Sequence, residues 1–148
     1  MKKRISKIKL QIKACEANPS PPIGPALGSK GINIMKFCTE FNDYTKNNLS
    51  LEKGIIVTTI INIYTDKSFD FIVKSAVTTN LIKNILNIDK GSSSPNKNKI
   101  AKISYSQILL IIEKKNDLFI NSRNSAIKTI IGTAKSMGIE VEDFEYEK

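Results

Sequence analysis

The order of apolar and polar residues divides the chain into two halves with different periods. Apolar residues alternate with lysine and glutamine over residues 7–13, and this period of two is typical of a strand with one buried and one exposed face. Residues 55–64 are rich in β-branched side chains, and the alternation returns over residues 69–73 after a polar turn. The pattern therefore predicts three strands in the first half of the chain.

One helix is expected between the first two strands. Four apolar residues are spaced i, i+3, i+4 and i+7, which places them on one face of a helix that begins after Gly31 and ends near Lys46. They are Ile34, Phe37, Cys38 and Phe41. Before this helix, residues 18–25 contain four prolines, and proline is excluded from the interior of helices and sheets. We expect this segment to be irregular.

The second half is predicted to be helical. Apolar residues recur at helical spacing over residues 76–88. A second helix is expected from Ser104, whose spacing from Gln107 is that of a capping box, to about Lys115. A last helix is expected over residues 122–137, ended by the glycine that follows.

These elements predict an α+β protein of two domains. Residues 1–74 form an N-terminal α+β domain with a three-stranded sheet, a packed helix and the proline-rich segment. Residues 75–141 form a C-terminal, all-helical domain of three helices, in which the serine-, asparagine- and lysine-rich residues 91–99 are a loop. Residues 142–148 form an acidic tail, which is expected to be solvated.

The charge of the chain indicates a polyanionic partner. Lysine and arginine number 23 against 14 aspartates and glutamates, which gives a net charge of +9. The first 74 residues carry +6 and residues 75–138 carry +7, and the last ten residues offset this excess with −4. A nucleic acid is favoured over an anionic membrane surface, because the sequence contains no basic amphipathic helix with aromatic anchors.

Composition also argues against an enzyme. The chain has no histidine, which excludes the triads and metal sites that use it, and its two cysteines, Cys15 and Cys38, are too few for a cysteine zinc site. Residues 24–31 resemble a phosphate-binding loop only superficially, since no Ser or Thr follows Lys30. We therefore expect no catalytic residue, no metal and no cofactor. No membrane span is expected either, because no apolar run approaches the roughly 18 residues required.

The last predicted helix carries a row of small residues. Four of them, at the spacing i, i+3, i+4 and i+7, share one side, and two lysines flank that side. The small residues are Thr129, Gly132, Thr133 and Ser136, and the lysines are Lys128 and Lys135. Such a surface would let a sugar–phosphate backbone approach closely and would offer it hydroxyl donors. A seam packed against a neighbouring helix would show the same pattern, and periodicity does not decide between the two.

Two further segments have both a functional and an ordinary interpretation. The loop over residues 91–99 is either a mobile basic segment that becomes ordered on RNA or a solvated surface loop, as loops usually are. The proline-rich segment either presents a rigid apolar ridge to a partner or only connects two elements, and composition favours the connector.

Two groups of residues identify a family. Large-subunit ribosomal protein eleven, of bacterial or organellar type, has an N-terminal signature similar to Asn18-Pro-Ser-Pro-Pro-Ile-Gly-Pro-Ala-Leu-Gly28 followed by Gly31-Ile-Asn-Ile-Met-Lys-Phe-Cys38. Its C-terminal signature is similar to Pro95-Asn-Lys-Asn-Lys99 and Gly132-Thr-Ala-Lys-Ser-Met-Gly138. The resemblance covers residues 7–143, in order and at matching spacing.

The resemblance implies a structural protein of the large ribosomal subunit, whose C-terminal domain binds large-subunit rRNA at the GTPase-associated centre. Carried over by motif, two groups of residues would face the rRNA. They are Gly91, Ser92, Pro95, Asn96 and Lys97 in the loop, and Gly132, Thr133, Lys135 and Ser136 on the last helix. This implication favours the functional interpretation of both segments.

The resemblance also implies partners for the N-terminal domain. In the family this domain forms the stalk base, where it lies near the stalk-base ribosomal protein and the stalk complex and meets elongation factors transiently. Its proline-rich segment faces the rRNA across a cleft that binds thiostrepton-type antibiotics. The matching prolines of this antibiotic and factor side are Pro19, Pro21, Pro22 and Pro25, of which Pro22 and Pro25 match the positions on which antibiotic sensitivity depends.

The joint between the domains departs from the family pattern. Two adjacent prolines of the family are replaced here by Ala76 and Val77. Prolines at these positions would form a stiff hinge, so we expect a looser or differently oriented connection between the domains.

The compartment and one alternative function follow from composition. Enrichment in lysine, isoleucine and asparagine, with a strand that begins close to Met1, indicates a ribosome of a mitochondrion or plastid that encodes its own protein, or the cytoplasm of an AT-rich bacterium. The alternative function is non-specific binding of nucleic acid by charge alone. Such a protein would bind duplex DNA as well as folded RNA.

Overall fold

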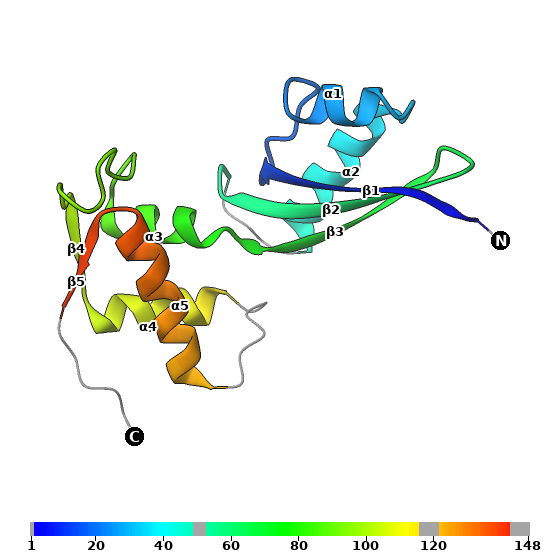
Figure 1. Cartoon of the computed structure of the whole chain (residues 1–148). Coiled ribbons are helices and arrows are strands. Elements are labelled where there is room, and N and C mark those ends of the chain that lie inside the picture. Colours follow the sequence, from blue (N-terminus) through cyan, green and yellow to red (C-terminus); the bar gives the residue numbers. More distant parts are fainter. Residues whose placement is uncertain (1, 49–52, 116–121, 143–148) are drawn as a thin grey trace. The chain divides into compact units, whose positions relative to one another are not determined.

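The structure is a computed structural model of the chain, and it describes residues 2–48, 53–115 and 122–142. The chain divides into two compact units, Met1–Lys74 and Ser75–Lys148, which we call the N-terminal unit and the C-terminal unit (Figure 1). The predicted acidic tail lies outside the described residues except for Glu142.

The N-terminal unit is built on a three-stranded sheet in the order β1-β2-β3. The strands are β1 (Arg4–Lys13), β2 (Ile56–Tyr64) and β3 (Phe69–Ala76), which confirms the three strands that the alternation predicts. β1 runs antiparallel to β2, with Ile8 opposite Ile61 and Lys9 opposite Ile60. Because successive side chains of a strand point to opposite faces, the isoleucines at 8 and 61 share one face and Lys9 lies on the other.

Two helices, α1 (Ile23–Gly28) and α2 (Ile34–Asn47), cover one face of this sheet (Figure 1). α2 begins after Asn33, whose side chain accepts a hydrogen bond from the Lys36 amide, as an N-cap residue does. Phe37 and Phe41 of α2 are fully buried, and their ring centroids lie 5.8 Å apart. Phe71 of β3 packs edge-on against Phe37, so aromatic residues fill the space between helix and sheet.

The helix α1 corrects the expectation that the proline-rich segment contains no helix. Pro25 lies in the first turn of α1, where a backbone amide needs no acceptor within the helix, so proline is tolerated there. Ile23 and Leu27 of α1 are buried in the core. Asn42 of α2 holds the start of the segment, because its amide group donates to the Ala17 carbonyl (3.1 Å) and accepts from the Ala17 N–H (2.8 Å).

The C-terminal unit contains the three helices that the sequence predicts. They are α3 (Thr78–Leu86), α4 (Tyr105–Lys114) and α5 (Arg123–Ser136). α3 ends two residues before the predicted end, because Asn87 adopts the left-handed conformation (φ 52°) that terminates a helix. The capping box of α4 is confirmed: the Ser104 hydroxyl accepts from the Gln107 amide, and the Gln107 side chain accepts from the Ser104 amide at 2.9 Å.

The C-terminal unit also contains a short sheet. This corrects the expectation that the unit is all-helical. β4 (Ala101–Ile103) and β5 (Ile139–Val141) pair in parallel, with Ile103 opposite Val141. Their isoleucines, Ile103 and Ile139, are fully buried. The largest fully buried side chains of the core that they enter are isoleucines of the three helices. These are Ile82, Ile108, Ile111, Ile127 and Ile130.

No helix within the described residues is both long enough and apolar enough to cross a bilayer.

Candidate nucleic-acid interface

The helix α5 has a buried side and an open side, as its sequence predicts. The buried side packs against α3, α4 and β5 through Ala126, Ile127, Ile130 and Ala134. The opposite side carries the four small residues Thr129, Gly132, Thr133 and Ser136, of which only Thr133 is half-buried and the others are exposed. We call this row of four the small-residue face.

The surroundings of Gly132 bear on the two interpretations of the small-residue face. A Cβ atom added at Gly132 would meet no other atom within 4 Å. Within the described residues, therefore, no neighbouring helix packs at Gly132, which counts against a seam between helices at this position. Glycine within a helix lowers stability by about 1 kcal/mol relative to alanine. Packing gives no compensation for that loss at Gly132, which favours a functional reason for the residue.

The hydroxyl groups of the small-residue face donate to their own helix. Thr129 donates to the Ser125 carbonyl at 3.0 Å, Thr133 to the Thr129 carbonyl at 3.1 Å, and Ser136 to the Thr133 carbonyl at 2.6 Å. These bonds hold the side chains close to the helix and direct lone pairs outward. The hydroxyls are thus available to RNA as acceptors, for example from ribose 2′-OH groups, whereas the sequence suggested donors.

The loop over residues 91–99 is attached at both ends to the C-terminus of α5. The Ser92 amide donates to the Met137 carbonyl at 2.9 Å, and the Ile100 amide donates to the Gly138 carbonyl at 3.0 Å. We call this segment the anchored loop. Its residues are therefore held next to the last turn of the small-residue face.

Gly138 is the point at which the anchored loop touches α5 most closely. It has φ +77°, the left-handed conformation expected of a glycine that ends a helix. An added Cβ would lie 2.5 Å from the Ser92 Cβ and 3.0 Å from the Asn98 carbonyl oxygen. The sequence predicts Gly138 only as a helix end, because no local pattern shows that the loop packs on it.

The anchored loop has hydrogen bonds of its own. The amides of Lys97 and Asn98 both donate to the Ser94 carbonyl, at 3.0 and 2.8 Å, and form a turn. The Ser94 amide donates to the Ser92 hydroxyl, and the Lys99 ammonium donates to the Pro95 carbonyl at 2.8 Å. The bonds leave the side chain of Lys97 exposed at the turn.

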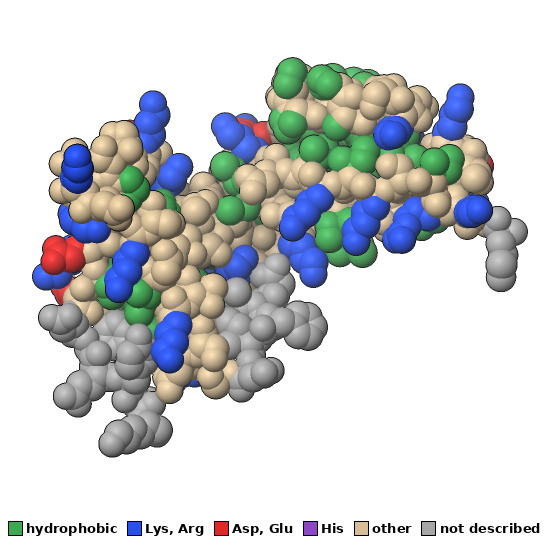
Figure 2. Space-filling model, in the orientation of Figure 1, with side chains coloured by type: hydrophobic (Ala, Val, Ile, Leu, Met, Phe, Trp, Pro, Cys, Tyr) green, Lys and Arg blue, Asp and Glu red, His purple; other side chains and the backbone are tan. Residues whose placement is uncertain are grey.

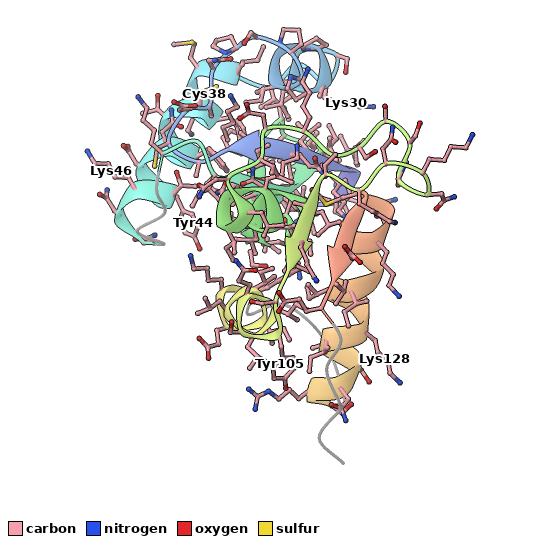
Figure 3. All side chains as sticks on the ribbon, turned by 90° about the vertical axis from the view of Figure 1, so that its left-hand side faces the viewer. Lys30, Cys38, Tyr44, Lys46, Tyr105 and Lys128 are labelled. Atoms are coloured by element: carbon pink, nitrogen blue, oxygen red, sulfur yellow. The ribbon has the colours of Figure 1, made fainter. Side chains whose placement is uncertain are left out.

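The structure brings the nine predicted RNA-facing residues into one region of the C-terminal unit. The loop residues Gly91, Asn96 and Lys97 are exposed, and Ser92 and Pro95 are half-buried. On α5, Gly132, Lys135 and Ser136 are exposed, and Thr133 is half-buried. In Figure 3 the anchored loop and the side of α5 that carries Lys128 extend to the same side of the unit. The region can offer point charges to phosphates and a surface of short side chains to a sugar–phosphate backbone.

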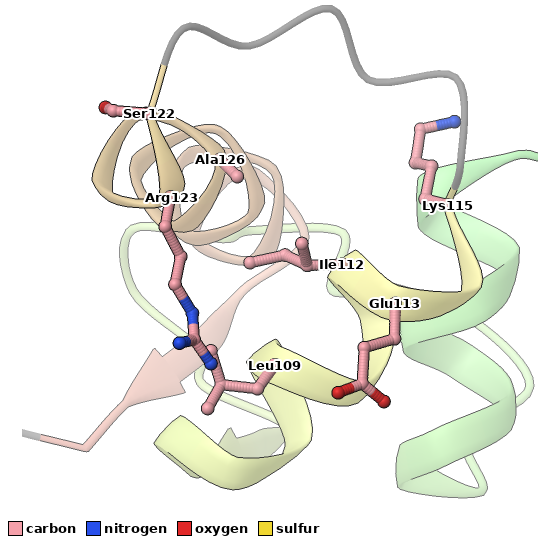
Figure 4. Close-up of a pocket in the computed structure, with 7 residues that line it drawn as sticks. All are labelled: Leu109, Ile112, Glu113, Lys115, Ser122, Arg123 and Ala126. Atoms are coloured by element: carbon pink, nitrogen blue, oxygen red, sulfur yellow. The ribbon is translucent and has the colours of Figure 1, made fainter.

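A hollow elsewhere in the C-terminal unit is separate from this region. It lies between α4 and α5 and has a volume of about 440 Å³ (Figure 4). Leu109, Ile112 and Ala126 give it an apolar wall, and Glu113 and Arg123 lie at its edge. None of the nine predicted residues lines it. Its remaining lining residues, Lys115 and Ser122, flank residues 116–121, which lie outside the described residues.

The four predicted prolines of the N-terminal unit are all exposed. Pro19, Pro21 and Pro22 precede α1, and Pro25 lies within it. The prolines at 21 and 22 also line a hollow of about 350 Å³ beside the end of β1. They are therefore accessible, and buried neighbours in α1 set their position.

Neither metal nor thiol chemistry is supported by the described residues. They contain no group of three or more Cys, Asp or Glu side chains that could hold a metal ion. Cys38 is buried, and burial raises the pKa of its thiol, which keeps it protonated and unreactive. Cys15 is half-buried, and its Sγ lies 3.6 Å from the Thr45 hydroxyl.

Comparison with known proteins identifies the family. Residues 8–69 match the family model "Ribosomal protein L11, N-terminal domain", and residues 74–141 match "Ribosomal protein L11, RNA binding domain". The chain belongs to the ribosomal protein L11 family. A relative from Campylobacter lari, described as large ribosomal subunit protein uL11, is 48% identical over 143 residues, which cover 96% of this chain and 99% of the relative.

Family membership confirms the resemblance seen in the two signatures. L11 proteins are structural ribosomal proteins of the large-subunit type, so the chain is not an enzyme. The RNA-binding domain of the L11 family coincides with the part of the chain that carries the anchored loop and the small-residue face.

Proposed function

We propose that this protein is a structural constituent of the large ribosomal subunit and binds large-subunit rRNA at the GTPase-associated centre through its C-terminal unit. The observation that carries the proposal is the open space at Gly132, on an exposed helix face beside the anchored loop. The match to an RNA-binding domain over residues 74–141 supports it. The relative from Campylobacter lari, named as a large-subunit protein, supports the choice of rRNA.

Each part of the region has a distinct role in this proposal. Gly132 lets a sugar–phosphate backbone lie directly on α5, and the hydroxyls of Thr133 and Ser136 accept hydrogen bonds from it. Lys97 and Lys135 neutralise phosphates on either side. The remaining loop residues set the shape that the RNA must match. They are Gly91, Ser92, Pro95 and Asn96.

The N-terminal unit is proposed to form the stalk base. There it would contact the stalk-base ribosomal protein and the stalk complex and would meet elongation factors transiently. The exposed ridge of Pro19, Pro21, Pro22 and Pro25 supports this role, because buried side chains of α1 hold it in a defined position. A rigid ridge loses little conformational entropy when a partner or an antibiotic binds.

The ribosome concerned is proposed to be that of a mitochondrion or plastid, or of an AT-rich bacterium. The lysine, isoleucine and asparagine content of the chain supports this choice. Identification of the rRNA that co-purifies with the protein would test it directly.

A competition experiment tests the proposed function against the alternative of non-specific binding. The full chain is bound to a labelled fragment of the GTPase-associated rRNA, and unlabelled duplex DNA of equal phosphate content is added at several salt concentrations. We expect the DNA to compete at least about 100-fold more weakly than the same unlabelled rRNA, because specific binding exceeds non-specific binding by roughly 10³-fold or more. Equal competition would leave only a charge-driven interaction and would overturn the proposal.

A further inference from the structure

The sheet of the N-terminal unit has one face that no described element of this unit covers. α1 and α2 pack on the face that carries Phe69 and Phe71, and the other face is left open (Figure 1). The register of β1 and β2 identifies the residues that point to the open side. They are Lys7, Lys9, Gln11 and Lys13 of β1, opposite Asn62, Ile60, Thr58 and Ile56 of β2.

The third strand contributes to the same face. Asp70 of β3 accepts a hydrogen bond from the Asn62 side chain at 2.7 Å and another from the Tyr64 hydroxyl, so its side chain lies on the open side. The alternation of β3 then places Ile72 and Lys74 there as well. We call these residues of the three strands, together, the open sheet face.

The open sheet face is strongly basic. Lys7, Lys9, Lys13 and Lys74 are exposed, and none of them pairs with a carboxylate of the described residues. The acidic residue of the face, Asp70, is already engaged by two hydrogen bonds. Figure 2 shows blue side chains in a row along the sheet, on the side away from α1 and α2.

Apolar side chains lie among these lysines. Ile60 is directly opposite Lys9, and Ile72 has 55% of its surface exposed. When a partner covers an isoleucine that is exposed within a charged surface, the complex is stabilised by about 25 cal/mol for each Å² removed from water. Apolar residues surrounded by charged ones are the arrangement found in protein–protein interfaces.

The same composition argues against single-stranded RNA whose bases stack on this face. Sheets that bind single-stranded RNA stack its bases on aromatic side chains at the centre of the sheet. The aromatic residue of the open sheet face is Tyr64, which lies at the end of β2 with its hydroxyl bound to Asp70. The central positions are held by Thr58, Ile60 and Ile72 instead. These side chains offer no stacking surface for a base.

One end of the open sheet face continues into a hollow. Gln11, Lys13 and Ile56 of the face also line the 350 Å³ hollow beside Pro21 and Pro22. A partner that lies along the lysines therefore reaches an additional site at the end of β1, which combines apolar residues with Lys13 and Glu16. This continuity favours an elongated segment over a single bound ion.

We propose that the open sheet face binds an acidic segment of a protein. Carboxylates of that segment pair with Lys7, Lys9, Lys13 and Lys74, and its apolar side chains cover Ile60 and Ile72. The four lysines supply charge complementarity, which raises the association rate and selects against basic partners. The proposal rests on the proposed function only in assigning protein partners, rather than rRNA, to the N-terminal unit.

The test compares two double variants of the full chain that change the net charge equally. Lys7→Glu/Lys9→Glu reverses the charge on the open sheet face. Lys30→Glu/Lys46→Glu reverses it after α1 and at the end of α2, which lie on the covered side of the sheet (Figure 3). Each variant is assembled into large subunits that lack this protein. Lysine acetylation and carbodiimide cross-linking, which joins lysines to nearby carboxylates, are then mapped by mass spectrometry.

We expect Lys7, Lys9 and Lys74 of the unchanged protein to be acetylated at least about tenfold more slowly in the subunit than in the free chain, because a bound partner excludes water from an interface centre. They should also be cross-linked to aspartates or glutamates of one other protein. These cross-links should be lost from Lys7→Glu/Lys9→Glu, at Lys74 included, and retained in the control variant. The variant Ile72→Ser, which keeps the charge, should reduce them as well.

Two outcomes would overturn the proposal. Acetylation as fast in the subunit as in the free chain would show a bare, solvated face. Cross-links from these lysines to nucleotides on irradiation would show an RNA-binding face. Binding of all variants to the isolated rRNA fragment is measured in parallel, and we expect it to be unchanged. If the unchanged protein does not bind the rRNA fragment, the proposed function is contradicted. If it binds the fragment but its lysines form no cross-links to carboxylates in the subunit, only the assignment of the open sheet face is contradicted.

Discussion

The small-residue face and the open sheet face belong to units that both carry net positive charge, but the two faces are built in opposite ways. The small-residue face has Gly132 at its centre and hydroxyls that are folded back onto the helix, so a ligand can approach the helix backbone. The open sheet face carries long lysine side chains at alternate strand positions, with isoleucine between them. Positive charge can therefore serve different partners, because the residues between the charges decide what can approach.

Shape and charge also differ in how they respond to substitution. A surface that works by close approach should fail when a side chain is added, even at constant charge. A surface that works by charge should tolerate a change in shape at its edge and fail on charge reversal. Single substitutions can therefore separate binding by close approach from binding by charge.

Gly138→Ala should have the largest effect. The substitution forces alanine into φ +77° and places its Cβ 2.5 Å from that of Ser92, so we expect the C-terminal unit to lose about 2–4 kcal/mol and to bind the rRNA fragment poorly. Thermal unfolding and filter binding would measure both. Gly54→Ala is the matched control, because Gly54 has φ +87° but nothing within 4 Å of an added Cβ. An equal loss of stability in both variants would show that backbone strain, and not contact with the anchored loop, is the cause.

Gly132→Leu should separate binding from stability. Nothing lies within 4 Å of an added Cβ, so we expect unchanged or slightly raised stability, as helix propensity favours leucine over glycine by up to about 1 kcal/mol. Affinity for the rRNA fragment should fall about 10- to 100-fold, because the backbone of the RNA can no longer reach α5. Asn84→Leu, at an exposed position of α3, is the control and should bind normally. Normal binding by Gly132→Leu would remove the small-residue face from the interface.

Salt dependence should distinguish the lysines of the two faces. Replacing Lys97 and Lys135 by alanine should lower the slope of log affinity against log salt by roughly 0.7–0.9 for each phosphate that is no longer neutralised. Replacing Lys7 and Lys9 by alanine should leave that slope unchanged for the rRNA fragment. Titrations between low and moderate salt would provide the slopes. A reduced slope in the second variant would bring the open sheet face into the RNA interface.

Asp66→Asn should have the smallest effect and should be confined to the N-terminal unit. Hydrogen bonds from Ser68 and the ion pair with Lys2 (2.9 Å) hold the pKa of the exposed Asp66 carboxyl well below its ordinary value. A lowered native pKa stabilises the fold above the unfolded pKa of about 3.9, and the contribution is lost as pH falls through the native pKa. The variant should therefore have a slightly lower Tm at pH 7 and the same Tm as the unchanged protein at the lowest pH. A difference in Tm that grows on acidification would contradict this assignment.

Local patterns predicted most of the fold, because strands and helices each bury apolar residues that recur at a regular spacing along the sequence. The alternation around Lys9 and the capping box at Ser104 were both confirmed. The patterns failed where the structure depends on distant contacts. β4 and β5 have three residues each, too few to show a period, and they pair across more than 30 residues of chain. The helix α1 was missed because a proline in the first turn of a helix looks the same in sequence as a proline in a loop.

The candidate interface was likewise predictable only in part from the sequence. The spacing from Thr129 to Ser136 places four small residues on one side of α5, but it does not reveal what lies opposite that side. The empty space at Gly132 and the contact between Gly138 and the anchored loop are properties of packing. The family signatures include both segments, and for that reason the resemblance pointed to residues whose packing the sequence pattern does not show.

The attachment of the anchored loop at Met137 and Gly138 has a consequence for the energetics of binding. A free loop of this length loses closure entropy when its ends are brought together, and the loss grows as the logarithm of its length. Here the hydrogen bonds to Met137 and Gly138 close the loop when the unit folds. That entropy is therefore lost before RNA arrives, so more of the contact energy remains available as affinity. A variant that released one end should therefore weaken binding even though no side chain proposed to meet the RNA is substituted.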